Sequence, residues 1–206
     1  MQSEAIICLK CRHLLPRTGY HLRRGNPVEQ LFWGRIPLIA ASACFEFRKS
    51  GGVQNMLHSL KYEGVRDIGL EIGRIYGREL MQADVFAERE LIIPVPLHPN
   101  KLRVRGYNQS ELFARGLAES IPGAAFSPAV ERIVHTSTQT RKSRFERWKN
   151  VETVFSPSGD YIAALKNKRI LLVDDVVTTG ATLESCAAVL LRNGAHSVAI
   201  ACIAAA

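Results

Sequence analysis

Residues 169–183 read RILLVDDVVTTGATL, an apolar run that ends in two adjacent carboxylates and a turn rich in threonine. The apolar run predicts a buried strand, and the residues from Thr182 onward predict a helix. In a parallel sheet, the loop after the carboxyl end of a strand is where ligands bind. We therefore expect residues 174–181 to form a ligand-binding loop at a helix N-terminus.

The residue types in this loop favour a sugar phosphate. Backbone N–H groups and the helix dipole attract an anion, and the threonine hydroxyls add donors. Gly180 lets the backbone approach a ligand closely because it has no side chain. Asp174 and Asp175 would repel a phosphate, so we expect them to accept hydrogen bonds from the vicinal hydroxyls of a ribose. The alternative is an ordinary turn with acidic residues beside a helix start.

Composition narrows the class of protein. The chain has 206 residues, 47% of them hydrophobic, and a net charge of +8. The basic excess favours a phosphorylated small molecule or a nucleic acid as partner, although a basic surface also serves solubility. Since no stretch approaches the roughly 18 apolar residues that span a membrane, and no signal peptide begins the chain, we expect a cytoplasmic protein without a membrane span.

Strands and helices alternate along most of the chain, which predicts an α/β fold with a mainly parallel sheet flanked by helices. We divide the chain into a small appendage, residues 1–30, and a regular domain, residues 31–206. The expected strands are 43–49 (half-exposed), 90–95, 168–173 and 197–203, with 130–135 as a further candidate. The expected helices are 53–62, 67–82, 182–192 and one that Ser110 caps.

Three more segments are distinctive: LKYEGVRDIG (60–69), PVPLHPNKLRVRGYNQSELFARGLA (94–118) and TQTRKSRFERWKNVETVF (138–155). In this order, and over nearly the whole chain, they resemble the ComF family of competence-associated proteins, which includes GntX-like members. The motif VDDVVTTGAT is similar to the phosphoribosyl pyrophosphate (PRPP) loop of type I phosphoribosyltransferases. The resemblance therefore implies that fold.

The resemblance also implies roles for the loop residues. The two acids would contact the ribose hydroxyls, and the threonine-rich turn would hold the 5-phosphate. Mg²⁺ would accompany PRPP, bound largely through the ligand's own oxygens. No catalytic residue is assigned. The residues expected to bind PRPP are Asp174, Asp175, Val176, Val177, Thr178, Thr179, Gly180, Ala181 and Thr182.

A basic segment follows the strand predicted at residues 90–95. Its three cations in five residues suit a loop that clamps pyrophosphate and closes over it, or else a solvated basic turn. The residues after it, 107–109, offer polar and stacking surface or cap the next helix. The members expected at the pyrophosphate are Pro96, Leu97, His98, Lys101, Arg103, Arg105 and Gly106.

A second basic segment interleaves cations with aromatic residues, a composition that suits single-stranded nucleic acid. The same pattern also fits a helix that packs Phe145 and Trp148 on the core and exposes its cations. The nucleic-acid candidates are Arg141, Lys142, Arg144, Arg147 and Trp148.

Five cysteines argue against a complete disulfide framework. ComF relatives usually carry two C-x₂-C pairs that form a four-cysteine zinc site, but this chain has only Cys8 and Cys11. His13 and His21 are candidates to complete a Zn²⁺ site, although their spacing is unusual. The alternative is a vestigial or truncated knuckle. Cys44, Cys186 and Cys202 are expected in the core.

The sequence leaves three functions open. The first is a ComF-like protein that binds PRPP or a related phosphosugar and handles single-stranded DNA during DNA uptake, alongside a helicase. The second is an active phosphoribosyltransferase that transfers the 5-phosphoribosyl group to a base or amine. The third is a non-catalytic module that senses PRPP. The oligomeric state, including a homodimer, is open as well.

Overall fold

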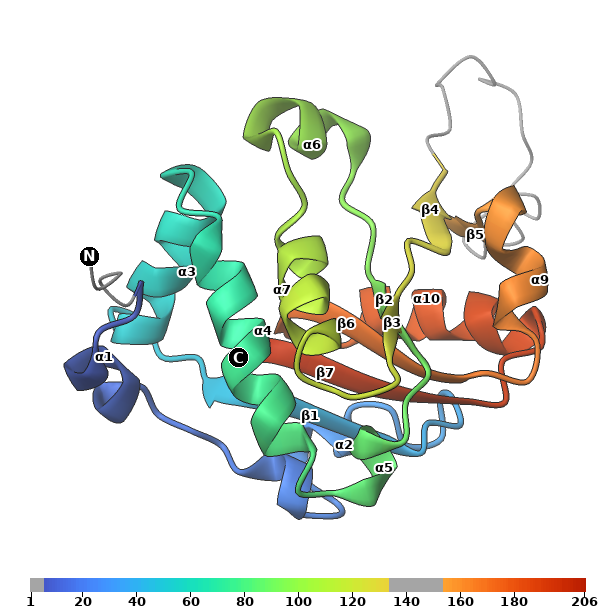
Figure 1. Cartoon of the computed structure of the whole chain (residues 1–206), viewed down its shortest axis with the longest axis horizontal. Coiled ribbons are helices and arrows are strands. Elements are labelled where there is room, and N and C mark those ends of the chain that lie inside the picture. Colours follow the sequence, from blue (N-terminus) through green and yellow to red (C-terminus); the bar gives the residue numbers. More distant parts are fainter. Residues whose placement is uncertain (1–5, 134–153) are drawn as a thin grey trace.

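The computed structural model describes residues 6–133 and 154–206, without the side chains of residues 9–11 and 160 (Figure 1). Its main feature is a five-stranded sheet of order β1-β7-β6-β2-β3, in which every pairing is parallel. The prediction of a mainly parallel sheet is confirmed. The strands are β1 (Ala40–Glu46), β2 (Leu91–Pro94), β3 (Ala125–Phe126), β6 (Arg169–Val177) and β7 (Ser197–Ala205).

Helices cover both faces of this sheet (Figure 1). In the described part of the chain, every helix is too short or too polar to span a bilayer. The longer helices are α3 (Gly52–Tyr62), α4 (Asp67–Leu80), α6 (Pro99–Arg105), α7 (Gln109–Ala118) and α10 (Ala181–Arg192). The shorter elements are α1 (Leu9–Leu14), η1 (Tyr20–Leu22), α2 (Pro27–Gln30), α5 (Asp84–Ala87), η2 (Gly159–Tyr161), α9 (Ile162–Leu165) and the antiparallel pair β4 (Val130–Arg132) and β5 (Phe155–Pro157).

The central strand β6 contributes to two hydrophobic cores. Leu171 and Val173 belong to the core under α3, α4 and α7, whereas Ile170 and Leu172 belong to the core under α10. Successive strand side chains point to opposite faces, so an unbroken apolar run fills both cores. Cys44, Cys186 and Cys202 are buried in these cores, as expected.

Several predicted elements are wrong in detail. The strand predicted at 43–49 begins at Ala40, and its residues 40–45 are buried rather than half-exposed, because β1 pairs with β7 and helices cover it. The candidate strand at 130–135 is β4, which pairs with β5 outside the main sheet. The division at residue 30 stays a prediction, although Ile7, Leu15 and Val28 of the appendage are buried in the two cores.

Helices α4 and α7 approach each other through glycines. A Cβ atom on Gly116 would lie 2.1 Å from the carbonyl oxygen of Leu70, and one on Gly73 would lie 2.4 Å from that of Phe113. At these two positions, backbone therefore lies against backbone, and no side-chain atom is among the nearest neighbours that could move aside. This contact positions α7, whose first turn reaches the edge of the sheet beside β2 and β6.

The connections define where a ligand crevice should lie. Strands β2 and β6 are neighbours, with Ile93 opposite Leu172. The chain leaves β2 through α6 and α7 toward β3, and leaves β6 through α10 toward β7, in the opposite direction across the sheet. Ligands of open α/β sheets bind outside the carboxyl ends of strands at such a switch point.

The glycine contact leads to a stability prediction. Replacement Gly116→Ala should lower the free energy of unfolding by about 1–3 kcal/mol, because the new methyl group forces the helix backbones apart. Thermal or urea unfolding measures the change. The matched control is Gly159→Ala, where a Cβ atom meets nothing within 4 Å and φ is not positive. Equal stability of the two variants would contradict the packing described.

Candidate functional site

The acidic pair lies inside a strand rather than in a loop. Strand β6 continues past the acids to Val177, with Asp174 opposite Cys202 and Val177 opposite Ala205. The predicted loop of residues 174–181 was therefore too long, because pairing with β7 extends the sheet to its last residues. The irregular turn is only residues 178–180, and the two carboxylates stand on rigid sheet backbone.

Asp174 is held by the first turn of α7. Its Oδ1 accepts hydrogen bonds from the Ser110 hydroxyl and from the Asp175 backbone N–H, each at 2.8 Å. The prediction that Ser110 caps α7 was wrong. Asn108 is the N-cap: its side chain accepts from the Ser110 N–H at 3.1 Å and donates to the Val95 carbonyl at 2.9 Å. Because Asn108 caps the helix, the Ser110 hydroxyl is available to donate its hydrogen bond to Asp174.

Burial, and after it the negative charge of Asp175, raise the pKa of Asp174 to about 7. The hydrogen bonds from Ser110 and from the Asp175 N–H, together with the Lys61 charge, act in the opposite direction. Asp174 is therefore an acceptor whose charged form is costly in the free protein. Donors supplied by a ligand would stabilise that form.

Asp175 has an internal counter-ion. Lys61, in the last turn of α3, places its Nζ 2.6 Å from Asp175 Oδ2. The side chains are 21% and 17% exposed, so the pair is largely removed from solvent. The two neighbouring acids thus have different surroundings, since Asp174 faces a serine and Asp175 faces a lysine.

The threonine turn is shaped by residues far away in sequence. Gly180, the N-cap of α10, has φ +77°, and a Cβ atom there would lie 2.8 Å from the ring of Phe32, which is buried. Arg35 donates a hydrogen bond to the Thr179 carbonyl at 3.0 Å. The fold itself therefore requires glycine at position 180. This requirement adds to the close approach of a ligand that the sequence predicts there.

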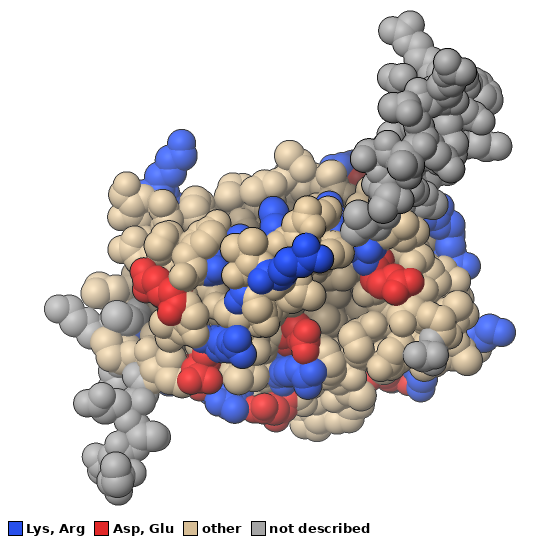
Figure 2. Space-filling model, turned by 90° about the horizontal axis from the view of Figure 1, so that it is seen from above, with Lys and Arg blue, Asp and Glu red and all other residues tan. Residues whose placement is uncertain are grey.

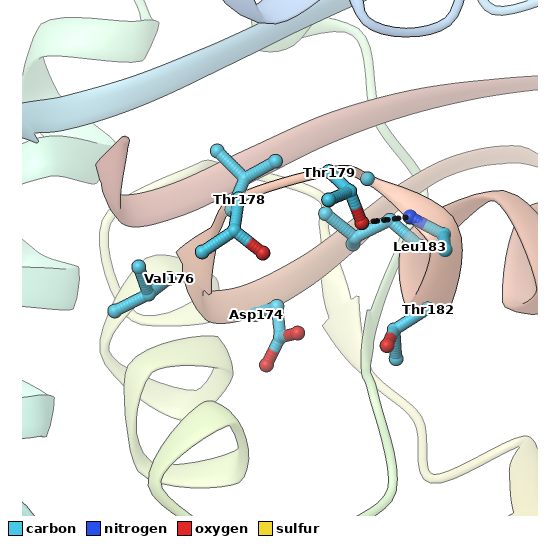
Figure 3. A pocket seen from close by; sticks show the side chains of 9 residues that line it. Asp174, Val176, Thr178, Thr179, Thr182 and Leu183 are labelled. Atoms are coloured by element: carbon cyan, nitrogen blue, oxygen red, sulfur yellow. Dashed lines mark hydrogen bonds between the residues drawn. The ribbon is translucent and has the colours of Figure 1, made fainter. Parts of the chain in front are cut away.

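A hollow of about 230 Å³ opens at this turn. Figure 3 shows the Asp174 carboxylate and the hydroxyls of Thr178 and Thr182 facing the same space. The Thr179 hydroxyl is turned to the backbone, where it lies 3.5 Å from the Ala181 nitrogen. The lining residues are Asp174, Val176, Val177, Thr178, Thr179, Gly180, Ala181, Thr182 and Leu183.

Asp175 alone among the predicted residues 174–182 does not line this hollow. It lines a second hollow on the other side of the strand end, beside α3. The two carboxylates therefore line two adjoining hollows, and their contact with the ribose hydroxyls stays a prediction. Successive residues of a strand point to opposite sides, which separates the two carboxylates.

The arrangement at the first hollow suits an anion that is joined to a hydroxyl-bearing group. Helix α10 begins there, so free backbone N–H groups and the positive end of the helix dipole face the space. The threonine hydroxyls add neutral donors, and the Asp174 carboxylate accepts from hydroxyls at the opposite wall. One small hollow thus combines groups that suit an anion with an acceptor that suits hydroxyls.

The predicted basic loop is mostly a helix. His98 caps α6, since its Nδ1 accepts from the Asn100 N–H at 3.2 Å, and Gly106 ends α6 with φ +75°. Arg105 donates to Gln109 Oε1 at 2.9 Å and lies over the Tyr62 ring at 5.0 Å.

Helix α6 stands away from the sheet on two extended segments (Figure 1). Pro96, Leu97 and His98 are half-buried after the end of β2, whereas Lys101 and Arg103 are exposed. Figure 2 shows basic side chains across the middle of the face on the α6 side, with acidic ones interspersed. The structure thus brings residues 96–98 to the strand edge and leaves the free cations on the helix.

The structure describes only part of two predicted sites. The nucleic-acid candidates at 141–148 lie outside the described residues, as does the Cys11 side chain. Cys8 is exposed, and both ring nitrogens of His21 are buried against the domain, with the ring edge-on to Tyr76 at 5.9 Å. Among described residues, no three His, Cys, Asp or Glu side chains gather to hold a metal. The zinc site stays a prediction.

Sequence reasoning missed the residues that support the acids and the turn. These are Lys61, Ser110, Phe32 and Arg35, which come from three separate segments. The blocks at 60–69 and 94–118 contain Lys61 and Ser110, but no periodicity or spacing connects either of them to residues 174–175.

Comparisons with known proteins agree with this fold. A family model described as the phosphoribosyl transferase domain matches residues 110–206. DNA utilization protein YhgH of Shigella flexneri is 30% identical over 206 residues, which cover 98% of this chain and 85% of that protein. Competence protein F of Haemophilus influenzae is 32% identical over 80% of this chain and 66% of its own.

A solved structure described as the allosteric regulatory enzyme of purine biosynthesis is also similar. It has a TM-score of 0.49 and 20% identity, over 68% of this chain and 26% of its own. The sequence relatives, matched along almost the whole chain, and the domain model that covers the acidic strand, the threonine turn and α10 lead to one conclusion. This chain belongs to the ComF family and has the type I phosphoribosyltransferase fold.

Proposed function

We propose that this protein binds PRPP or a related 5-phosphosugar and acts in DNA uptake. The observation that carries the binding is the shared hollow of Asp174, Thr178 and Thr182 at the start of α10. The 5-phosphate binds the backbone N–H groups and hydroxyls of the turn. The ribose hydroxyls reach the acids at the end of β6, so that the sugar lies across the strand end.

The acids at the end of β6 and the cations of α6 fit a sugar that carries pyrophosphate and Mg²⁺. Carboxylate oxygens are ligands that Mg²⁺ accepts, and the ion would be held mainly by the oxygens of PRPP itself. The exposed Lys101 and Arg103 on α6 supply positive charge for the pyrophosphate. Lys61 leaves Asp175 when the ligand's hydroxyls or cation take its place.

The DNA role rests on the relatives. Two of them are named DNA utilization protein and competence protein F, and the net charge of +8 favours a polyanionic partner. We propose that single-stranded DNA contacts Arg141, Lys142, Arg144, Arg147 and Trp148. We also propose that the protein works with a DNA-uptake helicase in this role. A phosphosugar would then be the ligand that regulates or accompanies that role.

Transfer of the 5-phosphoribosyl group is the second candidate, because the matching domain is that of phosphoribosyl transferases. An incoming base or amine would displace pyrophosphate from C1 of the sugar. No side chain needs to act as nucleophile in that reaction. The protein would bind both partners, and positive charge would stabilise the departing pyrophosphate.

The binding site is tested by Asp175→Asn. This change removes a charged acceptor for a ribose hydroxyl, so Mg²⁺-dependent PRPP affinity should fall by about tenfold or more. Isothermal titration calorimetry measures the affinity. Asp84→Asn is the matched control, since Asp84 is exposed in α5 at the opposite end of β2 and should bind normally. Unchanged affinity of Asp175→Asn would contradict the placement of the sugar.

The raised pKa of Asp174 gives a prediction for the ligand-free protein. In the folded protein Asp174 keeps its proton up to about pH 7, whereas in the unfolded chain it releases the proton near pH 4. Asp174 therefore lowers the free energy of unfolding as the pH rises from 4 to 7. The stability of Asp174→Asn relative to the natural protein should therefore increase from pH 4 to pH 7, by up to about 1.4 kcal/mol per unit.

Urea unfolding across this pH range measures the difference, and contributions of other groups cancel between the two proteins. A difference in the free energy of unfolding that stays constant with pH would show that folding does not raise the pKa of Asp174.

The link between the pocket and DNA uptake is tested in a naturally transformable bacterium that depends on this protein. Deletion should reduce transformation by chromosomal DNA, and the natural gene should restore it. Asp175→Asn should restore it poorly at equal protein level, while Asp84→Asn should restore it fully. Full restoration of transformation by Asp175→Asn would show that DNA uptake does not depend on the pocket.

A further inference from the structure

Lys61 is the charged neighbour of the acidic pair. Its ammonium lies 2.6 Å from Asp175 Oδ2, and the two side chains are only 21% and 17% exposed. Both side chains line the hollow between α3 and the end of β6, which is larger than the threonine hollow and has a volume of about 860 Å³. Among the described residues that line it, Lys61 is the one lysine or arginine.

The ion pair leaves little of the Asp175 carboxylate open to a ligand. Only 17% of this side chain is exposed, and the ammonium covers one of its oxygens. The sheet fixes the acid from behind, because Val176 beyond it pairs with Ala204 of β7. A lysine ammonium, by contrast, stands at the end of a flexible four-carbon chain. When a sugar hydroxyl takes its place at Asp175, Lys61 is therefore the group that moves.

The displaced ammonium needs another negative charge, since a cation mostly removed from solvent is costly without one. Glu63 is close in sequence, but it is paired with His58 at 3.2 Å near the surface. Ribose 5-phosphate offers only neutral hydroxyls at the C1 end of the sugar, whereas PRPP carries a pyrophosphate there. With the phosphate in the threonine turn and the ring hydroxyls at the acids, C1 points past Asp175, so this pyrophosphate comes beside Lys61.

Tyr62 connects the space around Lys61 to the cations of α6. It lines the larger hollow and also a third hollow of about 590 Å³, whose wall includes Lys101 and Arg105. Arg105 is already held there, since it donates to Gln109 at 2.9 Å and to the Tyr62 hydroxyl at 3.3 Å. In the proposed binding mode, an anion on C1 thus has the α6 cations on one side and Lys61 on the other.

We propose that Lys61 exchanges partners when the ligand binds, leaving the Asp175 carboxylate for the pyrophosphate on C1. This inference rests on the proposed function and adds to it the residue that selects the ligand. A sugar hydroxyl releases the ammonium, and only a ligand with an anion on C1 gives it a new partner. Lys61 therefore makes the site prefer PRPP over ribose 5-phosphate, two ligands that share the 5-phosphate and the ribose hydroxyls.

Calorimetry of PRPP and of ribose 5-phosphate, at one fixed Mg²⁺ concentration, tests the exchange. Lys61→Gln removes the charge but can still donate a hydrogen bond to Asp175, and Lys61→Met is a second neutral variant of similar length. Both variants should bind PRPP about tenfold or more weakly, because a charge-assisted hydrogen bond is lost. Their affinity for ribose 5-phosphate should not fall, since this ligand offers Lys61 no anion.

Two further variants control for charge and for position. Lys61→Arg keeps the positive charge and should keep most of the preference for PRPP. Lys166→Gln removes a lysine at an exposed position before the amino end of β6, the end of the strand away from the acids. It should bind both ligands as the natural protein does.

The remaining outcomes contradict the exchange. If the neutral variants lose affinity for both ligands equally, Lys61 only positions Asp175, and if they gain affinity for both, Lys61 only blocks the acid. If their PRPP affinity is unchanged, other cations bind the pyrophosphate. If the natural protein binds ribose 5-phosphate as tightly as PRPP, selection by Lys61 is refuted and the sugar-phosphate site stands. If it binds neither ligand, both proposals fail.

Discussion

The continuation of β6 to Val177 is the constraint on which the site depends. Pairing with β7 as far as Ala205 holds two adjacent acids in extended backbone, and this geometry turns their carboxylates to opposite sides. One then meets Ser110 and the threonine hollow, and the other meets Lys61 and the larger hollow. A loop at this position would let both acids turn to solvent and lose these distinct environments.

The same constraint connects packing to chemistry. Ser110 reaches Asp174 because Asn108 caps α7, and α7 lies close to the sheet because glycines let it pack backbone-to-backbone on α4. Phe32 and Arg35 fix the turn from the other side. Burial makes Asp174, at the centre of this framework, costly to ionise. Groups with such perturbed pKa values cluster at functional sites.

The sequence predicted a mainly parallel sheet and a glycine-threonine turn between β6 and α10, because apolar runs and such turns are local signals. The predictions from the sequence were wrong where contacts between distant segments determine the structure. The burial of β1 depends on β7, the strand character of the acids depends on the same partner, and the Lys61–Asp175 pair joins residues 114 positions apart in the chain. The helix α6 was missed because its basic composition resembled a solvated loop, although Pro99 and Gly106 mark its two ends.

The most direct measurement is an amide NMR titration of the protein with PRPP in the presence of Mg²⁺. In the proposed binding mode, the largest shifts fall on the backbone N–H groups of residues 178–182, with smaller shifts at Asp174, Asp175 and Lys61. Saturable shifts confined to other segments, with residues 174–182 unmoved, would contradict it.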